Sequence, residues 1–327
     1  MRSFAYARAT DAPEAVAAYR PGTAYLGGGT NLVDLMRLGV ATPDSLIDVS
    51  QATSGQIDDG PGGGLLIGAA VRNSDLAADP RVRERYPMLA RAVLDGASGQ
   101  VRNMATVGGN LLQRTRCPYF QDVLTACNKR SPGSGCQAME PGAETANLAI
   151  LGQSAACVAT HPSDMAVALA ALGATVQVSG PGSSEVRGIP MPGLHRLPEA
   201  SPERDTVLAP GELITAVELP PPPPGRSTYR KVRERASFAF ALVSVAAMLE
   251  VADGTVTGCR LALGGVAHAP WRCHGAEQAM LGQPATAGTY ASAAAEELEA
   301  AHPLPGNEYK VTLARNLIPA VLEELSS

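Results

Sequence analysis

Apolar and polar positions along the first hundred residues predict short strands and short helices in turn. Three brief apolar runs are bounded by glycine, proline or polar residues, which is typical of buried strands: 24–26, 45–49 and 65–69. Helical periodicity predicts helices at 11–19, 32–38 and 87–94, with another beginning at 74. Asp11 stands where an N-cap is expected, and Pro87 falls in a first helical turn, where proline is tolerated.

The second half of the chain begins with a helix over 163–172, for which Ser163 is the expected N-cap, and a strand over 175–178. Five prolines at 220–224 cannot form a central strand, so they predict a domain boundary. We therefore expect one domain over residues 1–222 and a second over 226–327. The second domain should hold strands at 229–233 and 258–263 and helices at 287–300 and 308–325.

The segment 111–160 lacks regular patterning and contains four of the six cysteines: Cys117, Cys127, Cys136 and Cys157. A loop this long inside a compact domain is usually functional. The spacing C-x9-C-x8-C-x20-C matches neither a ferredoxin pattern nor paired zinc knuckles. By spacing alone, free cysteines and a metal site are both open. Cys259 and Cys273 stand apart and are expected to be ordinary core residues.

Two glycine loops offer a second kind of chemistry. Gly27-Gly-Gly-Thr-Asn31 lies between a predicted strand and a helix, and Thr106-Val-Gly-Gly-Asn110 precedes the cysteine segment. Neither has the GxGxxG spacing of a Rossmann site or the lysine of a P-loop, which disfavours an NAD-dependent dehydrogenase. Glycine nevertheless lets backbone N–H groups approach a diphosphate closely, and two loops could clamp it from both sides. The alternative is two tight turns.

Composition narrows the class of protein. The chain has 327 residues and a net charge of −5, so no basic face for nucleic acid is indicated. Aromatic residues make up 4%, which leaves little material for stacking on bases. Six cysteines are too few for a disulfide scaffold, and neither a membrane span nor an export signal is expected.

Together these segments resemble the FAD-binding medium subunit of molybdenum hydroxylases, the xanthine dehydrogenase and aldehyde oxidoreductase family. The resemblance is carried by both glycine loops and by further motifs that extend over essentially the whole chain: 67–72, 162–166, 210–214, 229–233 and 262–267. It implies an α+β protein with a two-subdomain vanillyl-alcohol-oxidase-like FAD-binding domain, followed by a small α+β C-terminal domain.

The resemblance also implies which residues bind FAD. By matched position they are Tyr25, Leu26, Gly27, Gly28, Gly29, Thr30, Asn31, Leu32, Thr106, Gly108, Gly109, Asn110, Asp164, Leu213 and Lys231. Without the resemblance, Asp164 would be a first-turn helix acid, Lys231 a solvated strand charge and Leu213 a core residue. No catalytic residue is assigned. His161 is the histidine closest to this site, and a loop histidine bonded to backbone is the simpler interpretation.

The cysteine segment occupies a place where ordinary family members pass quickly to the next helix. It most resembles the FAD subunits of bacterial periplasmic aldehyde oxidoreductases, which implies a [4Fe–4S] cluster held by the four cysteines. Four nearby basic residues would offset the cluster's charge, or form a solvated rim or a docking face: Arg114, Arg116, Lys129 and Arg130.

The expected function is electron transfer within a molybdenum-dependent aldehyde oxidoreductase, which converts an aldehyde to a carboxylic acid. Electrons would pass from a large molybdopterin subunit through [2Fe–2S] clusters of a small subunit to FAD, and then to an external acceptor. The alternatives are a stand-alone flavin oxidoreductase and a scaffold subunit that binds zinc. Co-export with a signal-bearing partner would place the complex in the periplasm, with the cytoplasm as the alternative.

Overall fold

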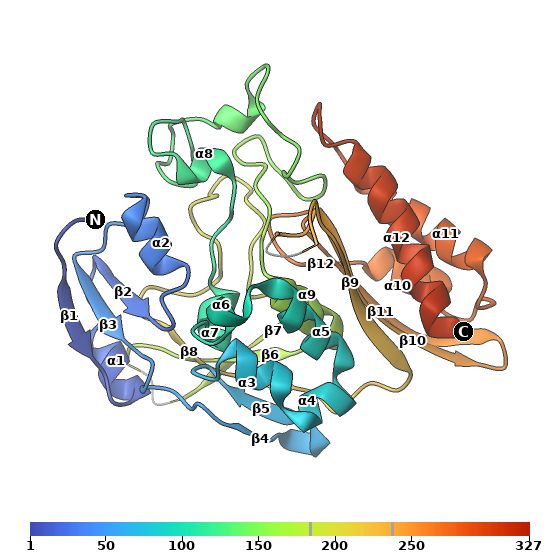
Figure 1. Ribbon diagram of the computed structural model, residues 1–327, viewed down its shortest axis with the longest axis horizontal. Helices are drawn as coiled ribbons and strands as arrows, with labels where there is room; N and C mark the ends of the chain where they lie inside the picture. Colours follow the sequence, from blue (N-terminus) through green and yellow to red (C-terminus); the bar gives the residue numbers. More distant parts are fainter. Residues whose placement is uncertain (183–184, 237–238) are drawn as a thin grey trace.

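The computed structural model describes residues 1–182, 185–236 and 239–327, and it contains three separate β-sheets (Figure 1). A small sheet lies at the N-terminal end, a five-stranded sheet in the middle and a four-stranded sheet at the C-terminal end. Helices pack on the middle and C-terminal sheets, which confirms the predicted α+β class.

The N-terminal sheet is parallel and has the order β1-β3-β2, with bounds Ala5–Arg8, Ser45–Asp48 and Thr23–Leu26. Helix α1 (Ala12–Ala18) begins at Asp11, whose carboxylate accepts the N–H of Glu14, as predicted. Strand β2 runs directly into the first glycine loop, and α2 (Leu32–Arg37) follows that loop. The sheet therefore fixes where the loop lies.

The middle sheet is antiparallel, with the order β4-β5-β8-β6-β7 and the bounds Ile57–Asp59, Leu65–Gly68, Leu213–Leu219, Thr175–Ser179 and Arg187–Pro190. Short helices connect and cover it: α3 (Asn73–Ala78), α4 (Pro80–Arg85), α5 (Pro87–Gly96), α6 (Gly99–Arg102), α7 (Val107–Leu111) and α9 (Asp164–Leu172), with a 3-10 turn at Pro61–Gly63. Every residue of α9 is buried, because α5 packs on one side of it and the C-terminal sheet on another.

The cysteine segment leaves this body after α7 and returns at α9, and it extends away from the sheets at the top of Figure 1. Its regular structure is limited to α8 (Pro118–Gln121) and a 3-10 turn at Gln137–Met139. At its base, the Ser163 hydroxyl donates to the Asn110 side-chain oxygen at 2.5 Å. The two ends of the segment therefore meet at one point of the body.

The C-terminal part is a four-stranded antiparallel sheet covered on one face by helices. The order is β12-β11-β10-β9, with bounds Trp271–Arg272, Thr255–Gly264, Val243–Ala252 and Arg226–Val232. The helices are α10 (His274–Met280), α11 (Ala287–Glu297) and α12 (Tyr309–Ser326), with a 3-10 turn at Leu298–Ala300. Residues 220–224 form the connection between β8 and β9.

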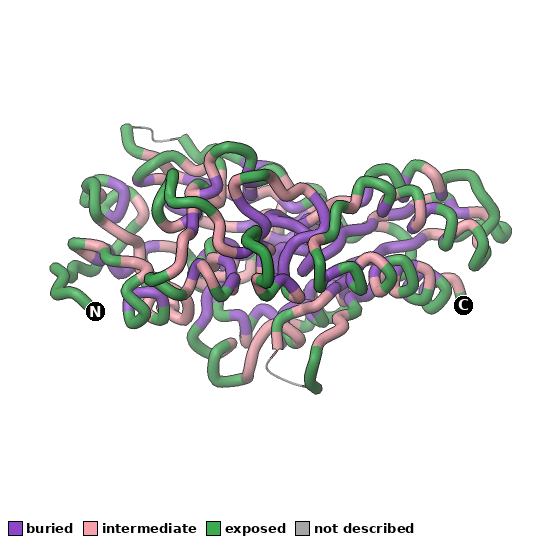
Figure 2. The backbone as a smooth tube through the Cα atoms, turned by 90° about the horizontal axis from the view of Figure 1, so that it is seen from above, coloured by how far each residue is buried: buried purple, intermediate pink, exposed green. Residues whose placement is uncertain are grey.

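Buried backbone is concentrated in the centre of the molecule and along β10 and β11 (Figure 2). Cys259 and Cys273 lie in the C-terminal core, as expected. Helices α4 and α10 and strands β1 and β8 were not predicted, because they are short or carry a weak periodicity. None of the helices in the described ranges is long and apolar enough to cross a membrane.

Candidate functional site

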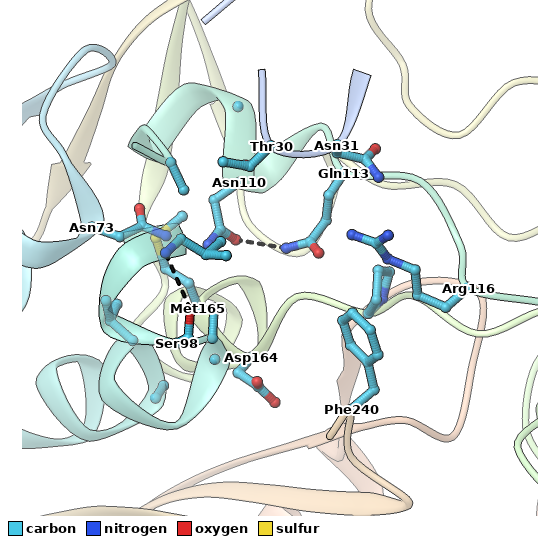
Figure 3. Close-up of a pocket in the computed structure, with 18 of the residues that line it drawn as sticks. Thr30, Asn31, Asn73, Ser98, Asn110, Gln113, Arg116, Asp164, Met165 and Phe240 are labelled. Carbon is cyan, nitrogen blue, oxygen red and sulfur yellow. Dashed lines mark hydrogen bonds between the residues drawn. The ribbon is translucent and has the colours of Figure 1, made fainter. Parts of the chain in front are cut away.

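Two adjoining cavities lie beside the glycine loops. The smaller has a volume of about 230 Å3 and is bordered by both loops, β2 and the start of β8. The larger, about 610 Å3, is lined mainly by residues of α5, α6 and α9 and of the chain leaving α7 (Figure 3). Thr30, Asn31 and Gly109 line both cavities, so the two lie next to each other at the loops.

The first glycine loop presents free backbone donors to this space. Among the described residues, no hydrogen bond uses the N–H of residues 27 to 30. Asn31 adds a side-chain donor: its oxygen accepts the N–H of Arg114 at 2.9 Å, while its buried amide nitrogen has no partner. Such a group of unpaired donors is suited to an anion such as a diphosphate.

Glycine is required at Gly28 by contact with the chain that leads into the second loop. A Cβ at this position would lie 1.9 Å from the carbonyl oxygen of Met104, far inside any real contact. At Gly29 the requirement is conformational, because its φ is +73°. The two loops are therefore packed backbone to backbone, and the sequence of the first loop follows from that packing.

The backbone N–H groups of the second loop are already engaged. Those of residues 107 to 110 donate to Val71, to Ala69, to the Thr106 hydroxyl and to the Thr106 carbonyl, at 2.8 to 3.2 Å. Thr106 is the N-cap of α7, and it lines the smaller cavity with Gly108. This loop therefore shapes the space by its position, and the free donors come from the first loop.

Most of the other residues predicted to bind FAD also border the two cavities. Tyr25, Leu32 and Leu213 line the smaller one, where the Tyr25 hydroxyl donates to the Gly211 carbonyl at 2.8 Å, and Asn110 lines the larger one. Leu26 is the last residue of β2 and does not line either cavity.

Asp164 and Lys231 form a buried ion pair at one wall of the larger cavity. Asp164 lines the cavity, whereas Lys231 lies behind it with a side-chain exposure of 0% and does not reach the space. The ammonium lies 2.8 Å from the Asp164 carboxylate and donates to the Asp95 carbonyl at 2.8 Å, and the Tyr229 hydroxyl donates to the other carboxylate oxygen. Burial raises the pKa of Asp164 above its usual value, although Lys231 and Tyr229 act to lower it.

Several cavity residues could not be found from the sequence. Asn73, Ser98, Gln113 and Phe240 line the larger cavity, but they come from four separate segments and belong to no motif (Figure 3). The side-chain oxygen of Asn73 is buried and has no hydrogen-bond partner. It adds an unpaired acceptor to the wall of the larger cavity, and the Asn73 N–H donates to the carbonyl of Ala105.

The four predicted cysteines converge on one site. Cys117, Cys127, Cys136 and Cys157 line a single small cavity, and all but Cys136 are buried. Burial raises the pKa of Cys117 to about 12 and that of Cys157 to about 11. The space between the side chains is only about 10 Å3. Within the described ranges, no group of three or more histidine, cysteine, aspartate or glutamate side chains is arranged to hold a metal ion.

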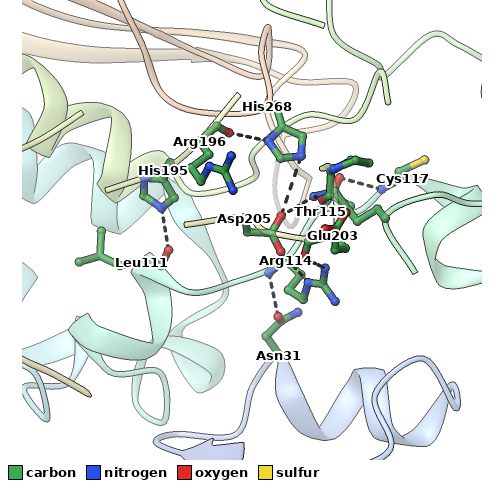
Figure 4. A network of polar contacts seen from close by, with 12 residues as sticks. Asn31, Leu111, Arg114, Thr115, Cys117, His195, Arg196, Glu203, Asp205 and His268 are labelled. Atoms are coloured by element: carbon green, nitrogen blue, oxygen red, sulfur yellow. Dashed lines mark hydrogen bonds and ion pairs between the residues drawn. The ribbon is translucent and has the colours of Figure 1, made fainter. Parts of the chain in front are cut away.

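A buried network joins the cysteine segment to the body of the protein (Figure 4). Asp205 pairs with Lys129, which lies two residues after Cys127 and is 1% exposed, and with Arg114 at 2.7 Å. Burial would raise the pKa of Asp205, but these two cations outweigh it and hold the pKa well below its usual range. Arg130 donates to the carbonyls of Tyr119 and Phe120 at 2.7 and 2.9 Å. Arg114, Lys129 and Arg130 are thus engaged in contacts within the protein, and of these Lys129 is fully buried while the Arg114 side chain is 30% exposed.

The histidines near the site are structural. His161 packs against His195, with ring centroids 4.2 Å apart, and its ring accepts the N–H of Ser163 at 3.3 Å. Burial lowers the pKa of both rings. His268 lies 3.9 Å from Asp205, but burial lowers its pKa to about 4, so it is neutral at pH 7. His161 therefore has the backbone-bonded role expected of a loop histidine.

The residues present fit FAD in shape and in donor chemistry. The two adjoining cavities, the free N–H groups and the unpartnered amide atoms of Asn31 and Asn73 suit a large cofactor with a diphosphate. Four thiols around one space have the donor chemistry of an iron–sulfur site. The 10 Å3 between them requires these side chains to move apart before a cluster is held.

Two protein families match this chain, one in its N-terminal part and one in its C-terminal part. Residues 2–222 match the family described as the FAD binding domain in molybdopterin dehydrogenase, and residues 227–325 match the CO dehydrogenase flavoprotein C-terminal domain. The aldehyde oxidoreductase FAD-binding subunit PaoB of Escherichia coli (strain K12) is 51% identical, over 99% of this chain and 98% of that protein. The glyceraldehyde dehydrogenase medium chain of Sulfolobus acidocaldarius is 26% identical, over 86% and 82% of the two chains.

Solved structures share the fold. A reconstituted CO dehydrogenase from Oligotropha carboxidovorans superimposes with a TM-score of 0.77 at 22% identity, over 99% of this chain and 98% of that one. Quinoline 2-oxidoreductase from Pseudomonas putida 86 gives a TM-score of 0.75 at 22% identity. The α+β architecture expected from the sequence is therefore found in experimentally determined structures.

Proposed function

The chain belongs to the family of FAD-binding medium subunits of molybdenum hydroxylases, and from this premise we propose that it is the electron-transferring subunit of an aldehyde oxidoreductase. One FAD would lie along the two adjoining cavities, with its diphosphate at the first glycine loop. The observation that carries this proposal is the row of N–H groups at 27 to 30, which have no partner among the described residues and belong to residues that line the smaller cavity.

When bound, FAD supplies the chemistry of accepting and releasing electrons. The protein's own contribution is to bind, orient and enclose it. The first loop would donate to the diphosphate, and Thr106, which packs against Gly27, lines the same cavity together with Gly108. Asp164 faces the larger cavity as a carboxylate fixed by Lys231 and Tyr229, so it offers an oriented acceptor. Lys231 then acts through Asp164 and does not touch the cofactor itself.

We further propose that the four cysteines hold a [4Fe–4S] cluster. Support comes from their convergence on one site and from the network that anchors the segment through Lys129 and Asp205. A bound cluster would also explain how about fifty residues of irregular chain keep a defined conformation although they contain so little secondary structure. A structural zinc site is the competing interpretation for the same four thiols.

The aldehyde substrate and the partners follow from the relatives. PaoB, at 51% identity, is named as the FAD-binding subunit of an aldehyde oxidoreductase. We infer that this chain likewise assembles with a large molybdopterin subunit and a small [2Fe–2S] subunit, which oxidise the aldehyde and deliver the electrons. Co-expression of the three chains should yield one complex that elutes as a single species, and separate elution of this chain would contradict the inference.

The periplasm is the proposed compartment, reached with a signal-bearing partner. Fractionation of cells that express all three chains, compared with cells lacking the partner that carries the signal, tests this. The chain should move from the periplasmic to the cytoplasmic fraction when that partner is absent, and an unchanged distribution would refute co-export.

The decisive experiment is quantification of cofactors in anaerobically purified protein. One FAD with about four irons and four sulfides per chain would support both sites. Cys127→Ser should then remove the iron and keep the flavin, whereas Cys259→Ser, a buried cysteine of the C-terminal core, should keep both. Flavin without iron would refute the cluster alone. Zinc with no flavin would refute both proposals.

A further inference from the structure

Arg116 stands at the boundary between the flavin site and the cysteine segment. It lines the larger cavity and also a third cavity of about 370 Å3, and the next residue, Cys117, lines that third cavity and the cysteine site. Its guanidinium lies over the ring of Phe240, 4.9 Å from the ring centroid, and faces the larger cavity (Figure 3). Stacking on an aromatic face fixes a guanidinium in position and leaves its edge free for hydrogen bonds.

The charge of Arg116 is not balanced by the described part of the chain. It forms no ion pair there, and its buried Nε has no hydrogen-bond partner. The other cations close by are paired: Arg114 with Asp205 at 2.7 Å, and Lys231 with Asp164 at 2.8 Å. Burial lowers the pKa of Arg116, and Asp34 acts against this only from beyond ion-pair distance. A desolvated cation of this kind is costly unless an anion completes the site.

The position of Arg116 indicates which part of FAD would lie beside it and provide the negative charge. The free N–H groups that suit the diphosphate border the smaller cavity, which Arg116 does not line. In the larger cavity Arg116 lies beside Phe240 and Gln113 and across from Met165 of α9, and Val93 of α5 adds to the apolar lining (Figure 3). Apolar walls with a few polar groups are suited to an aromatic ring system. The ring end of the cofactor is therefore the part that reaches Arg116.

We propose that Arg116 stabilises the negative charge that the flavin ring gains on reduction, and so raises the reduction potential of the bound cofactor. This rests on the proposed binding of FAD. The ring takes up two electrons and one proton and then carries one negative charge. The guanidinium keeps its own protons and donates hydrogen bonds to that anion. Because the charge exists only in the reduced form, the interaction favours reduced over oxidised FAD.

The size of the effect follows from the strength of such a contact. A hydrogen bond to a charged group contributes about 1.5–3 kcal/mol, which is about a 10- to 100-fold difference in affinity. Arg116→Gln should therefore bind reduced FAD about 10- to 100-fold less tightly relative to oxidised FAD. For a two-electron couple this corresponds to a midpoint potential about 30 to 60 mV more negative.

The test is a reductive titration of the full chain reconstituted with FAD, with the affinity for oxidised FAD measured separately. Arg116→Lys keeps the positive charge and should recover part of the shift. Arg83→Gln removes the same charge from the exposed face of α4 and should leave the potential unchanged. Iron content is measured in each variant to show that the cysteine segment is intact.

The outcomes separate the possible roles. A more negative potential in Arg116→Gln, with affinity for oxidised FAD changed less than about threefold, supports the proposal. An unchanged potential overturns it. Equal losses of affinity for both redox forms also overturn it, and would assign Arg116 to the diphosphate. If the unaltered chain binds no FAD, the proposed function itself fails, which is a different result from either.

Discussion

The buried Asp164–Lys231 pair permits a test of how this protein stabilises charge next to a cofactor site. The Lys231 side chain is 0% exposed and that of Asp164 is 4% exposed, so neither charge has water to replace a lost partner. Asp164→Asn keeps the shape of the side chain but removes the negative charge, so the buried Lys231 ammonium is left with neutral acceptors only. Removing one member of a buried pair costs about 3–5 kcal/mol, and we expect that loss in the free energy of unfolding.

A double-mutant cycle isolates the pair. Lys231→Met alone should cost a similar amount, whereas the two changes together should cost no more than either single change. The coupling free energy is then about 3 kcal/mol. The matched control is the pair Arg187–Glu212, which has a 2.7 Å contact but a 49% exposed arginine, and its coupling should be about 0–1 kcal/mol.

The assay is urea unfolding of the FAD-free chain, followed by circular dichroism and by the fluorescence of the single tryptophan, Trp271. Using the FAD-free protein separates stability from any contact between Asp164 and the cofactor. If Asp164→Asn costs less than about 1 kcal/mol, the level of the exposed control, then the carboxyl is protonated in the folded protein. That result would refute the ion pair and would agree with the raising of the Asp164 pKa by burial.

Three further predictions concern the loops and the C-terminal part. Gly28→Ala should abolish FAD binding, measured by flavin fluorescence, because its Cβ would lie 1.9 Å from a carbonyl oxygen; Gly99→Ala, with open space around it, should not. Burial lowers the pKa of Lys310 to about 7, so the unfolded chain binds one more proton than the folded chain between about pH 7 and 10. Unfolding free energy should therefore rise with pH in that window, and this slope should be absent in Lys310→Met. Asp205→Asn leaves the buried Lys129 uncompensated, so hydrogen exchange should speed up in the cysteine segment first; uniform acceleration would contradict its anchoring role.

What the sequence predicted well is local in origin. The N-caps Asp11 and Ser163 follow from one residue type before a periodic run, and both accept the backbone N–H three residues on. The first glycine loop is likewise recognisable, because a strand, three glycines and a helix start are contiguous in the chain. In both cases the pattern that identifies the feature lies in residues that are neighbours in sequence.

What the sequence could not predict depends on residues far apart. Asp205 lies 76 positions from Lys129 in a stretch without periodicity, so no pattern connects them. Arg116 and Phe240 meet across more than a hundred residues. Lys231 was placed at the cofactor by its motif, whereas the structure puts Asp164 between it and the cavity. A motif fixes the backbone position of a residue, but packing decides which atoms reach the ligand.

The contact between Asn110 and Ser163 has a consequence for how this protein could arise. Because the two ends of the cysteine segment meet at 2.5 Å, its roughly fifty residues could be gained or lost in one genetic event without displacing the elements on either side. The entropic cost of bringing the two ends of a loop together grows by only about 1 kcal/mol or less for each doubling of loop length. An ancestral protein of this fold could thus acquire the cysteine segment as an insertion at one site. A few side chains that bind the inserted segment to the body of the protein, such as Asp205 with Lys129, would then be enough to hold it in place.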